Sequence, residues 1–218
     1  MRLLPLGLTA NAASWRLEAT KPAGEQASLA LARDGQTCRF CGLACGPWAE
    51  VLHRNGDHAD DSLDNLATAC PACHACQHLG RDSGDQEYLV VWLPHLTQAA
   101  LNHLVRGVHH VFLDHGEAPH MAGPSSQDTP ALRSAYAAYR ELAACASVAQ
   151  AGLGTSSPRL VGEALLSLPP SAASRAAALV DGLRLLSRGR LLRNGVDVYP
   201  ACLECRAGPQ RNPGCSTS

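Results

Sequence analysis

Aromatic side chains are scarce in this sequence of 218 residues, where Phe, Trp and Tyr together make up 4%. That scarcity, beside abundant alanine and leucine, disfavours a β-sandwich and favours helices with small side chains. A strong charge of either sign is also lacking, since the formal net charge is −1. No overall basic field therefore indicates nucleic-acid binding. No run approaches the ~20 apolar residues of a membrane span, so the sequence predicts no membrane insertion.

The beginning of the chain and its cysteines indicate the compartment. The apolar run from Leu3 to Leu8 is interrupted by a proline and a glycine, which makes it too short and too broken for a secretory signal peptide. The ten cysteines are not spread through a short chain as a disulfide framework would be. Most of them fall into CxxC groupings, which are typical of metal ligands in a reducing compartment. We therefore expect a cytoplasmic protein.

Two CxxC pairs, Cys38/Cys41 and Cys70/Cys73, form the strongest motif in the chain. Each pair can present two sulfurs to one ion, so the two pairs together can close a tetrahedral Zn²⁺ site. A site closed by four thiolates leaves no open coordination position and stabilises the fold without doing chemistry. The sequence therefore predicts one structural zinc ion, and any catalysis would need a second metal elsewhere.

The elements around this motif indicate an α+β fold. Alternation of apolar and polar residues, or a short apolar run bounded by breakers, predicts strands. Spacing of three and four residues predicts helices, and Thr97 is placed to cap the longest of them. That helix is amphipathic, so its apolar face is either core or a docking surface. The expected strands are Ser14 to Thr20, Trp48 to Leu52 and Tyr88 to Leu93, and the expected helices are Glu25 to Arg33, His74 to Leu79 and the stretch from Thr97 to Phe112, with a loop from Arg81 to Gln86.

The C-terminal half is predicted to be mostly helical. Breakers and Ser/Thr residues between Gly116 and Pro130 indicate a linker, so we expect a metal-bearing domain over residues 1–116 and a helical region over residues 131–200. Residues 201–218, rich in Gly, Pro, Asn and Ser toward their end, are predicted to be a disordered tail. The helices expected in this half are Ala131 to Ala149, Val161 to Leu168 and Ala172 to Leu186, the last capped by Ser171.

Three features of this sequence have a functional and a structural interpretation. Arg184 to Arg193 interleaves arginine with leucine, and the pattern fits a basic patch less well than a solvated helical face. The pair Cys202/Cys205 is either a second metal or redox site or an exposed pair of thiols. A group of histidines has no carboxylates at matching spacing, which favours surface histidines over metal ligands: His103, His109, His110, His115 and His120.

Three strings in the central stretch resemble the HNH family of ββα-metal nucleases: Arg33 to Gly42, Glu50 to Gly56, and Asp64 to His74. The resemblance implies a zinc knuckle, a first strand and turn, and a second strand and helix. In that family a histidine of the first strand is the general base and is preceded by an Asp or His metal ligand. An asparagine orients, and the histidine after the last CxxC holds the catalytic metal. His53, Asn65 and His74 occupy the positions of base, orienting residue and ligand.

One departure from the nuclease pattern reverses its meaning. Leu52 stands where the first metal ligand belongs, and an isobutyl group cannot coordinate a cation. A catalytic ion would be left with His74 and little else. Without an ion to hold the scissile phosphate, His53 lacks the main stabilising contribution to such chemistry. We therefore expect no enzyme activity, and the alternative is an active HNH endonuclease that cleaves DNA.

A narrower resemblance covers the chain from about Ser14 to about His110. Its motifs are Ser14 to Leu17, Cys38 to Gly42, Asn55 to Leu66, the cysteine spacing 70-73-76, and Leu93 to Asn102. In order and spacing they resemble the DotN (IcmJ) family of Dot/Icm type IVB secretion systems. The resemblance implies an HNH-like zinc fold without nuclease function. It also implies a cytoplasmic adaptor in the coupling complex, peripheral to the inner membrane, which binds the coupling ATPase (DotL-like) for effector recruitment.

Overall fold

The computed structural model describes residues 3–10, 24–120, 123–172, 178 and 180–205. The strand predicted over Ser14 to Thr20 lies outside the described residues, as does the predicted tail from residue 206 onward. No helix in the described part of the chain is both long and apolar enough to cross a membrane.

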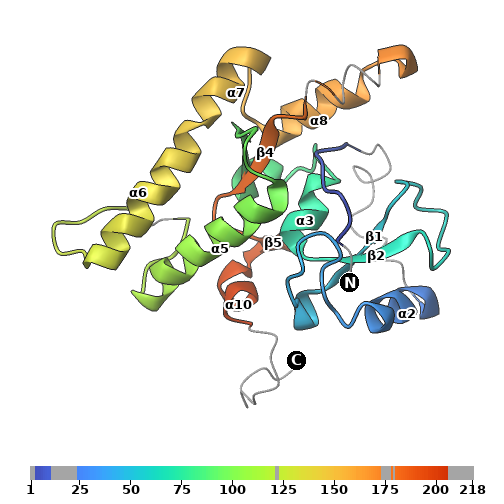
Figure 1. Ribbon diagram of the computed structural model, residues 1–218, viewed down its shortest axis with the longest axis horizontal. Coiled ribbons are helices and arrows are strands. Elements are labelled where there is room, and N and C mark those ends of the chain that lie inside the picture. The colour runs from blue at the N-terminus through green and yellow to red at the C-terminus, as the bar shows by residue number, and fades with distance from the viewer. Residues whose placement is uncertain (1–2, 11–23, 121–122, 173–177, 179, 206–218) are drawn as a thin grey trace.

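The part of the chain that carries the two CxxC pairs is a β-hairpin between helices (Figure 1). β1 and β2 pair antiparallel, with Leu52 opposite Ala67. Helix α2 packs on the hairpin from one side and α3 follows β2 directly. This ββα order is the one expected of an HNH-like core. The bounds are α2 (Glu25–Arg33), the 3-10 turn η1 (Gly46–Trp48), β1 (Glu50–His53), β2 (Leu66–Ala69) and α3 (Pro71–Cys76).

A second antiparallel ladder joins the two halves of the sequence. β3 (Tyr88–Trp92) pairs along its whole length with β4 (Leu183–Ser187). Helix α5 (Gln98–Asp114) lies against β4, and its N-cap is Thr97, as predicted, whose hydroxyl accepts a hydrogen bond from the Ala100 amide (3.2 Å). The division at residues 116 and 131 stays a prediction, and this ladder connects the regions on its two sides.

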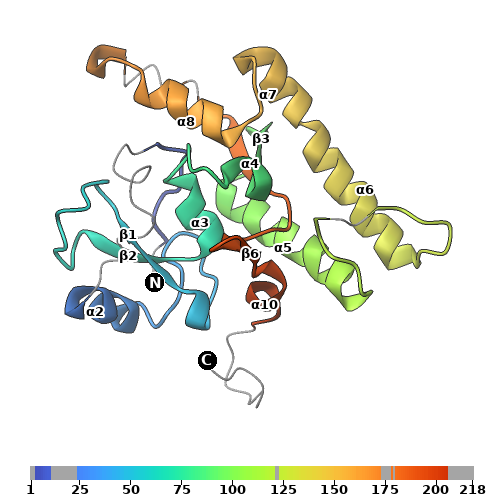
Figure 2. The ribbon, with the colours of Figure 1, turned by 180° about the vertical axis from the view of Figure 1, so that it is seen from behind.

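Helices from the second half cover the ladder. α6 (Pro130–Ala144) packs along α5, and α7 (Ala146–Leu153) continues from it across β3. In Figure 2 α6 and α7 follow one another along the right side of the molecule, and α8 lies to the left of α7. Aromatic rings fill the contact between α5 and α6, where the Phe112 and Tyr136 centroids are 4.9 Å apart. The remaining elements here are α4 (Gly84–Glu87), α8 (Pro158–Leu166) and η2 (Pro170–Ala172).

The end of the described chain returns to the part that carries the CxxC pairs. A small hairpin of β5 (Leu192–Arg193) and β6 (Val196–Asp197) leads into helix α10 (Tyr199–Glu204). Helix α10 packs on α5, where Leu203 is fully buried. The guanidinium of Arg106 on α5 donates to the carbonyl of Leu203 (2.8 Å) and to that of Cys202 (3.3 Å) at the C-terminal end of α10.

The α+β class is confirmed, and several element predictions need correction. The helix expected over Ala172 to Leu186 is wrong at its end, because Leu183 to Leu186 lie in β4 and pair with β3. The tail predicted from residue 201 is wrong in its first residues, since Ala201 to Glu204 belong to α10. The first strand starts at Glu50 because Gly46 to Trp48 form a 3-10 turn. Three further differences are smaller. The single helix predicted over 131–149 is two helices, α6 followed by α7, and the loop predicted over 81–86 ends in α4. The helix predicted after Cys73 begins already at Pro71.

The arginine-rich segment also differs from the solvated helical face expected for it. Its side chains bind polar groups of other elements instead of only facing water. The guanidinium of Arg188 donates to the carbonyl of Tyr88 (3.1 Å) and that of Arg184 to the carbonyl of Leu96. Arg193 forms an ion pair with Glu50 on β1. These long side chains thus connect β4 and β5 to the first half of the chain.

Helix α8 approaches the chain after α3 so closely that one position requires glycine. A Cβ on Gly162 would lie 2.5 Å from the backbone of Leu79 and Gly80. Gly162→Ala is therefore expected to lower the free energy of unfolding by about 1–3 kcal/mol, because backbone on both sides must shift. Gly152→Ala on α7 is the matched control, since nothing lies within 4 Å of its Cβ and alanine should stabilise the helix by up to about 1 kcal/mol. Urea unfolding of both variants checks the pair, and equal effects would contradict the close packing.

Candidate functional site

The four cysteines of the two CxxC pairs come together as predicted. The Sγ atoms of Cys38, Cys41, Cys70 and Cys73 lie within 4.8 Å of one another, and all four residues are buried. Sulfurs at this separation can each bind one central cation at the usual metal–sulfur distance of about 2.3 Å. The cluster could therefore hold a metal ion.

The backbone of the first knuckle turns around its two sulfurs. The amide of Cys38 donates to the carbonyl of Leu43 (2.8 Å), and the amide of Gly42 donates to the carbonyl of Cys38 (2.9 Å). Gly42 has a φ of 75°, a left-handed conformation that favours glycine. The sequence thus places a glycine where the chain must reverse beside the second ligand.

The second knuckle is the start of α3, which places two sulfurs at a helix N-terminus. Cys70 is the N-cap, and its Sγ accepts a hydrogen bond from the amide of Cys73 (3.4 Å). Asn102 on α5 donates through Nδ2 to the Sγ of Cys73 (3.3 Å). The neighbouring His103 donates to the carbonyl of Cys41 (2.7 Å). Donors of this kind stabilise thiolates and orient them as ligands, so α5 supports both knuckles from outside.

The protonation of the cluster depends on a cation. Hydrogen bonds with the other sulfurs lower the pKa of the Cys38 thiol, whereas hydrogen bonds with Cys38 and Cys41, together with burial, raise the pKa of the Cys73 thiol. By themselves the sulfurs share protons, because four buried negative charges so close together repel one another. A bound cation removes that repulsion and allows all four to act as thiolates.

The three residues at nuclease positions all lie at the hairpin and the following helix, but each has a partner within the scaffold. His53 Nε2 lies 2.8 Å from Asp61 Oδ1. Asn65 spans the β1–β2 loop, since its Oδ1 accepts from the Asn55 amide (3.0 Å) and its Nδ2 donates to the carbonyl of Asp60 (2.8 Å). These bonds hold the loop in shape.

The third of these residues, His74, faces β1. Its Nδ1 lies 2.7 Å from Oε2 of Glu50, and Glu50 also pairs with Arg193 from β5. Burial opposes ionisation of Glu50, but His74 and Arg193 outweigh it and lower its pKa to about 2. A charged carboxylate therefore links β1, α3 and β5.

Leu52 points into the core. It is 1% exposed and packs with Phe40 and the cysteine cluster. Its main chain pairs with Ala67 in the hairpin. The position that precedes the histidine on the first strand therefore contributes apolar packing beneath the knuckles.

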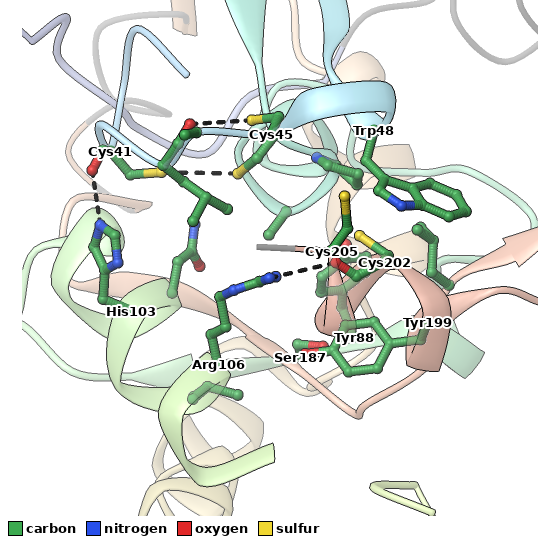
Figure 3. A pocket seen from close by; sticks show the side chains of 18 residues that line it. Cys41, Cys45, Trp48, Tyr88, His103, Arg106, Ser187, Tyr199, Cys202 and Cys205 are labelled. Atoms are coloured by element: carbon green, nitrogen blue, oxygen red, sulfur yellow. Dashed lines mark hydrogen bonds between the residues drawn. The ribbon is translucent and has the colours of Figure 1, made fainter. Parts of the chain in front are cut away.

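Three cysteines outside the cluster line a narrow cavity of about 50 Å³ between the first knuckle, α5 and α10 (Figure 3). Cys45, Trp48, Cys202 and Cys205 line it. Burial raises the pKa of Cys45 to about 12 and that of Cys202 to about 11, so these thiols stay protonated. The expectation of an exposed pair is wrong for Cys202, which is 8% exposed. Within the described residues, no group of three or more metal-ligating side chains includes this pair.

The surface histidines expected on α5 include an exception. His109 is fully buried, and its Nδ1 lies 2.8 Å from the hydroxyl of Tyr199 on α10. Burial lowers the pKa of His109 to about 3, so the imidazole is neutral and serves as a polar contact between two helices. Helical periodicity places His109 beside Val105 and Phe112 on the buried face of α5. The prediction of a surface position followed from its residue type and not from this periodicity.

Other residues that matter to the site carry no motif in the sequence. Glu50 orients His74, and Asp34 binds the knuckle through Arg39 (2.9 Å) and β2 through the Thr68 amide (3.0 Å). His58 and His78 lie beside the predicted histidines. No spacing rule connects these residues, although the concentration of histidines between positions 53 and 78 is a signal.

Comparison with known proteins adds one relative and no family model. No protein-family model matches the chain. The chain is 27% identical over 205 residues to "Type 4 apparatus protein DotN" of Legionella pneumophila subsp. pneumophila, and the alignment covers 90% of this chain and 89% of that protein. It thus extends well beyond the stretch that carries the sequence motifs. This similarity over nearly the whole of both chains supports the DotN family of Dot/Icm type IV secretion systems as the family that the sequence resembles.

Proposed function

We propose that the protein is a non-enzymatic adaptor of a type IVB secretion apparatus, in which a structural zinc ion holds an HNH-like core. Its partner would be the coupling ATPase together with other subunits of the coupling complex, and its place would be the cytoplasmic side of the inner membrane. The alignment with a type 4 apparatus protein over nine-tenths of both chains is the observation that carries this proposal.

The choice of zinc follows from the donor set. Four thiolates in tetrahedral reach of one point suit Zn²⁺, a borderline-soft ion without geometric preference of its own. The ligands come from two knuckles that are 28 residues apart in sequence, Cys38 to Cys41 and Cys70 to Cys73. Zinc would thus fix the α2 side of the hairpin to α3. With four protein ligands it would offer no position to a substrate.

The absence of enzyme activity is proposed from the surroundings of the nuclease positions. Leu52, 1% exposed in the core, offers no ligand where a nuclease needs one. One ring nitrogen of His53 and one of His74 are each hydrogen-bonded to a carboxylate, and Asn65 holds the β1–β2 loop in shape. We infer that these groups would not assemble a two-ligand cation site that clamps a phosphate. The candidate catalytic residues would survive as parts of the scaffold.

The second candidate function, a DNA endonuclease, is favoured by the presence of the His53–Asp61 pair (2.8 Å), which can orient an imidazole as a general base. We expect no nicking of supercoiled plasmid by the full chain with Mg²⁺ or Mn²⁺, since the metal ligand is missing. His53→Ala is the control variant. Nicking by the wild-type chain that disappears in His53→Ala would overturn the adaptor proposal and establish the nuclease.

Binding to the coupling ATPase is tested directly with purified components. The full chain and the coupling ATPase of the same host should co-elute in gel filtration and give a saturable binding curve. A chain treated with a strong zinc chelator should lose binding along with its fold, because a structural zinc contributes to folding. Separate elution of the intact, zinc-bearing chain at concentrations far above those in cells would contradict the proposed partner.

A further inference from the structure

Four histidines form a row across the hairpin and the end of α3. His53 ends β1, His58 lies in the β1–β2 loop, His74 is on α3 and His78 follows that helix. Consecutive ring centroids are 4.8 Å apart for His53 and His58, 5.6 Å for His58 and His78, and 4.6 Å for His78 and His74. The row therefore joins three segments of the chain outside the cysteine cluster.

The two outer imidazoles are oriented by carboxylates. His53 uses Nε2 toward Asp61 (2.8 Å), and His74 uses Nδ1 toward Glu50 (2.7 Å). Each ring keeps its second nitrogen for another partner. A metal-bound histidine usually has a carboxylate on its other ring nitrogen, which fixes the ring and raises its basicity as a ligand.

The two inner imidazoles have buried nitrogens without partners. Both ring nitrogens of His58 and Nδ1 of His78 are buried and make no hydrogen bond. His78 as a whole is 6% exposed. A buried polar atom that lacks a partner destabilises the fold, so its presence next to other ligand groups calls for an explanation.

Both inner rings are in the protonation state that binds metals. Burial, with the other histidines of the row, lowers the pKa of His58 and lowers that of His78 to about 3. Arg81 adds to this effect on His78, whereas Glu50 opposes it; Asp57 and Asp61 oppose it for His58. Neutral imidazoles carry the lone pair that a cation needs, and the nearby carboxylates supply negative charge.

We propose that this histidine row binds a divalent ion of the late first transition series, such as Zn²⁺, Ni²⁺ or Cu²⁺, as a second metal site distinct from the four cysteines. Imidazoles that share a tetrahedral ion have ring centroids about 5 Å apart, as the three consecutive pairs of the row do. In the described part of the chain, the four cysteine sulfurs are the ligand atoms that already lie close enough together to share one ion, and the ring nitrogens of the row are not among them. Closure of the histidine site therefore requires rotation of the rings, above all of His58 on its half-exposed loop.

Coordination by imidazoles would give the ion a structural role. His58 lies in the loop between β1 and β2, while His74 and His78 belong to α3 and its C-terminal side. A shared ion would bind the loop to the helix and satisfy the orphaned nitrogens. With its positions filled by protein ligands, the ion would be closed to substrate, so this site does not depend on nuclease activity.

Metal titration of the full chain tests the second site. The purified protein with its cysteine-bound metal is titrated calorimetrically with Zn²⁺, and in a parallel experiment with Ni²⁺. We expect about one further ion per chain, and a loss of affinity of at least ten-fold in His58→Ala. The control is His95→Ala, an exposed histidine outside the row, which should bind as the wild type does. Circular dichroism of each variant before titration verifies the fold.

Three results would overturn the proposal. One is that the wild-type chain takes up no ion beyond the one at the cysteines. Another is that His58→Ala and His95→Ala weaken binding equally, which would mean adventitious surface binding. The third comes from titration with Co²⁺, whose thiolate charge-transfer absorption would show that the added ion enters the cysteine cluster instead.

Discussion

Cys38→Ser is expected to unfold the metal-bearing part of the chain. Cys38 is fully buried among the other three ligands, and serine offers a harder, poorly ionised oxygen in place of a thiolate. Structural zinc sites of this kind contribute on the order of 10 kcal/mol of apparent binding free energy at neutral pH. That is comparable to the whole stability of a domain, about 5–15 kcal/mol. Loss of one ligand should therefore remove the metal and cooperative unfolding together.

The measurements are metal content by elemental analysis and thermal unfolding by circular dichroism. The wild-type chain should carry about one tightly held zinc per molecule. Cys145→Ser is the matched control, because this half-buried thiol lies outside the cluster and donates to the carbonyl of Glu141 on α6 (3.5 Å). It should keep its zinc and melt as the wild type does. A metal-free wild type, or a Cys38→Ser variant with an unchanged melting curve, would refute the zinc site.

Asp34→Asn is expected to produce the second largest loss. The Asp34 side chain is 1% exposed and binds Arg33 (2.8 Å), Arg39 (2.9 Å) and the amide of Thr68 (3.0 Å). It thus joins α2, the first knuckle and β2. An asparagine amide would direct an N–H group toward one of these donors and leave two guanidinium groups without a counter-charge. Breaking a buried pair in this way costs about 3 kcal/mol, measured as the free energy of unfolding in urea.

The same residue makes that loss depend on pH. Burial alone would raise the pKa of Asp34, but the hydrogen bonds from Arg33, Thr68 and Arg39 hold it well below its ordinary value. A depressed carboxyl pKa contributes stability that is complete above the unfolded-state pKa of about 3.9 and is lost as pH falls further. The difference between wild type and Asp34→Asn should be constant from about pH 5 to 8 and shrink below about pH 4. The exposed Asp82 supplies the control Asp82→Asn, for which a similar loss would contradict this role of Asp34.

The sequence predicts those parts of the molecule that depend on residues a few positions apart in the chain. The CxxC pairs place two sulfurs each within one turn, and Gly42 marks the backbone reversal beside the first pair. The capped helix after Thr97 follows from its own periodicity. In these cases the signal and the structure lie within the same few residues.

The parts that the sequence does not predict depend on distant partners. Leu183, Leu185 and Leu186 fit a helix as well as a strand, and pairing with β3 decides between the two. The neighbouring Gly35 indicates that a helix ends at Asp34. The burial of Asp34, in contrast, depends on its partners Arg39 and Thr68. For the histidine row, three segments must fold before the rings meet.

The pairing of β3 with β4 also determines when the fold can form during synthesis. Tyr88 is opposite Ser187, so β3 leaves the ribosome long before its partner exists. At ordinary rates of translation the wait is roughly 5–20 seconds. Through that interval an apolar strand has an open edge, which is a template for aggregation. Newly made chains therefore need either rapid cover of β3 by the helices that pack on it, α6 and α7, or a chaperone, and chains truncated before residue 183 should accumulate as aggregates.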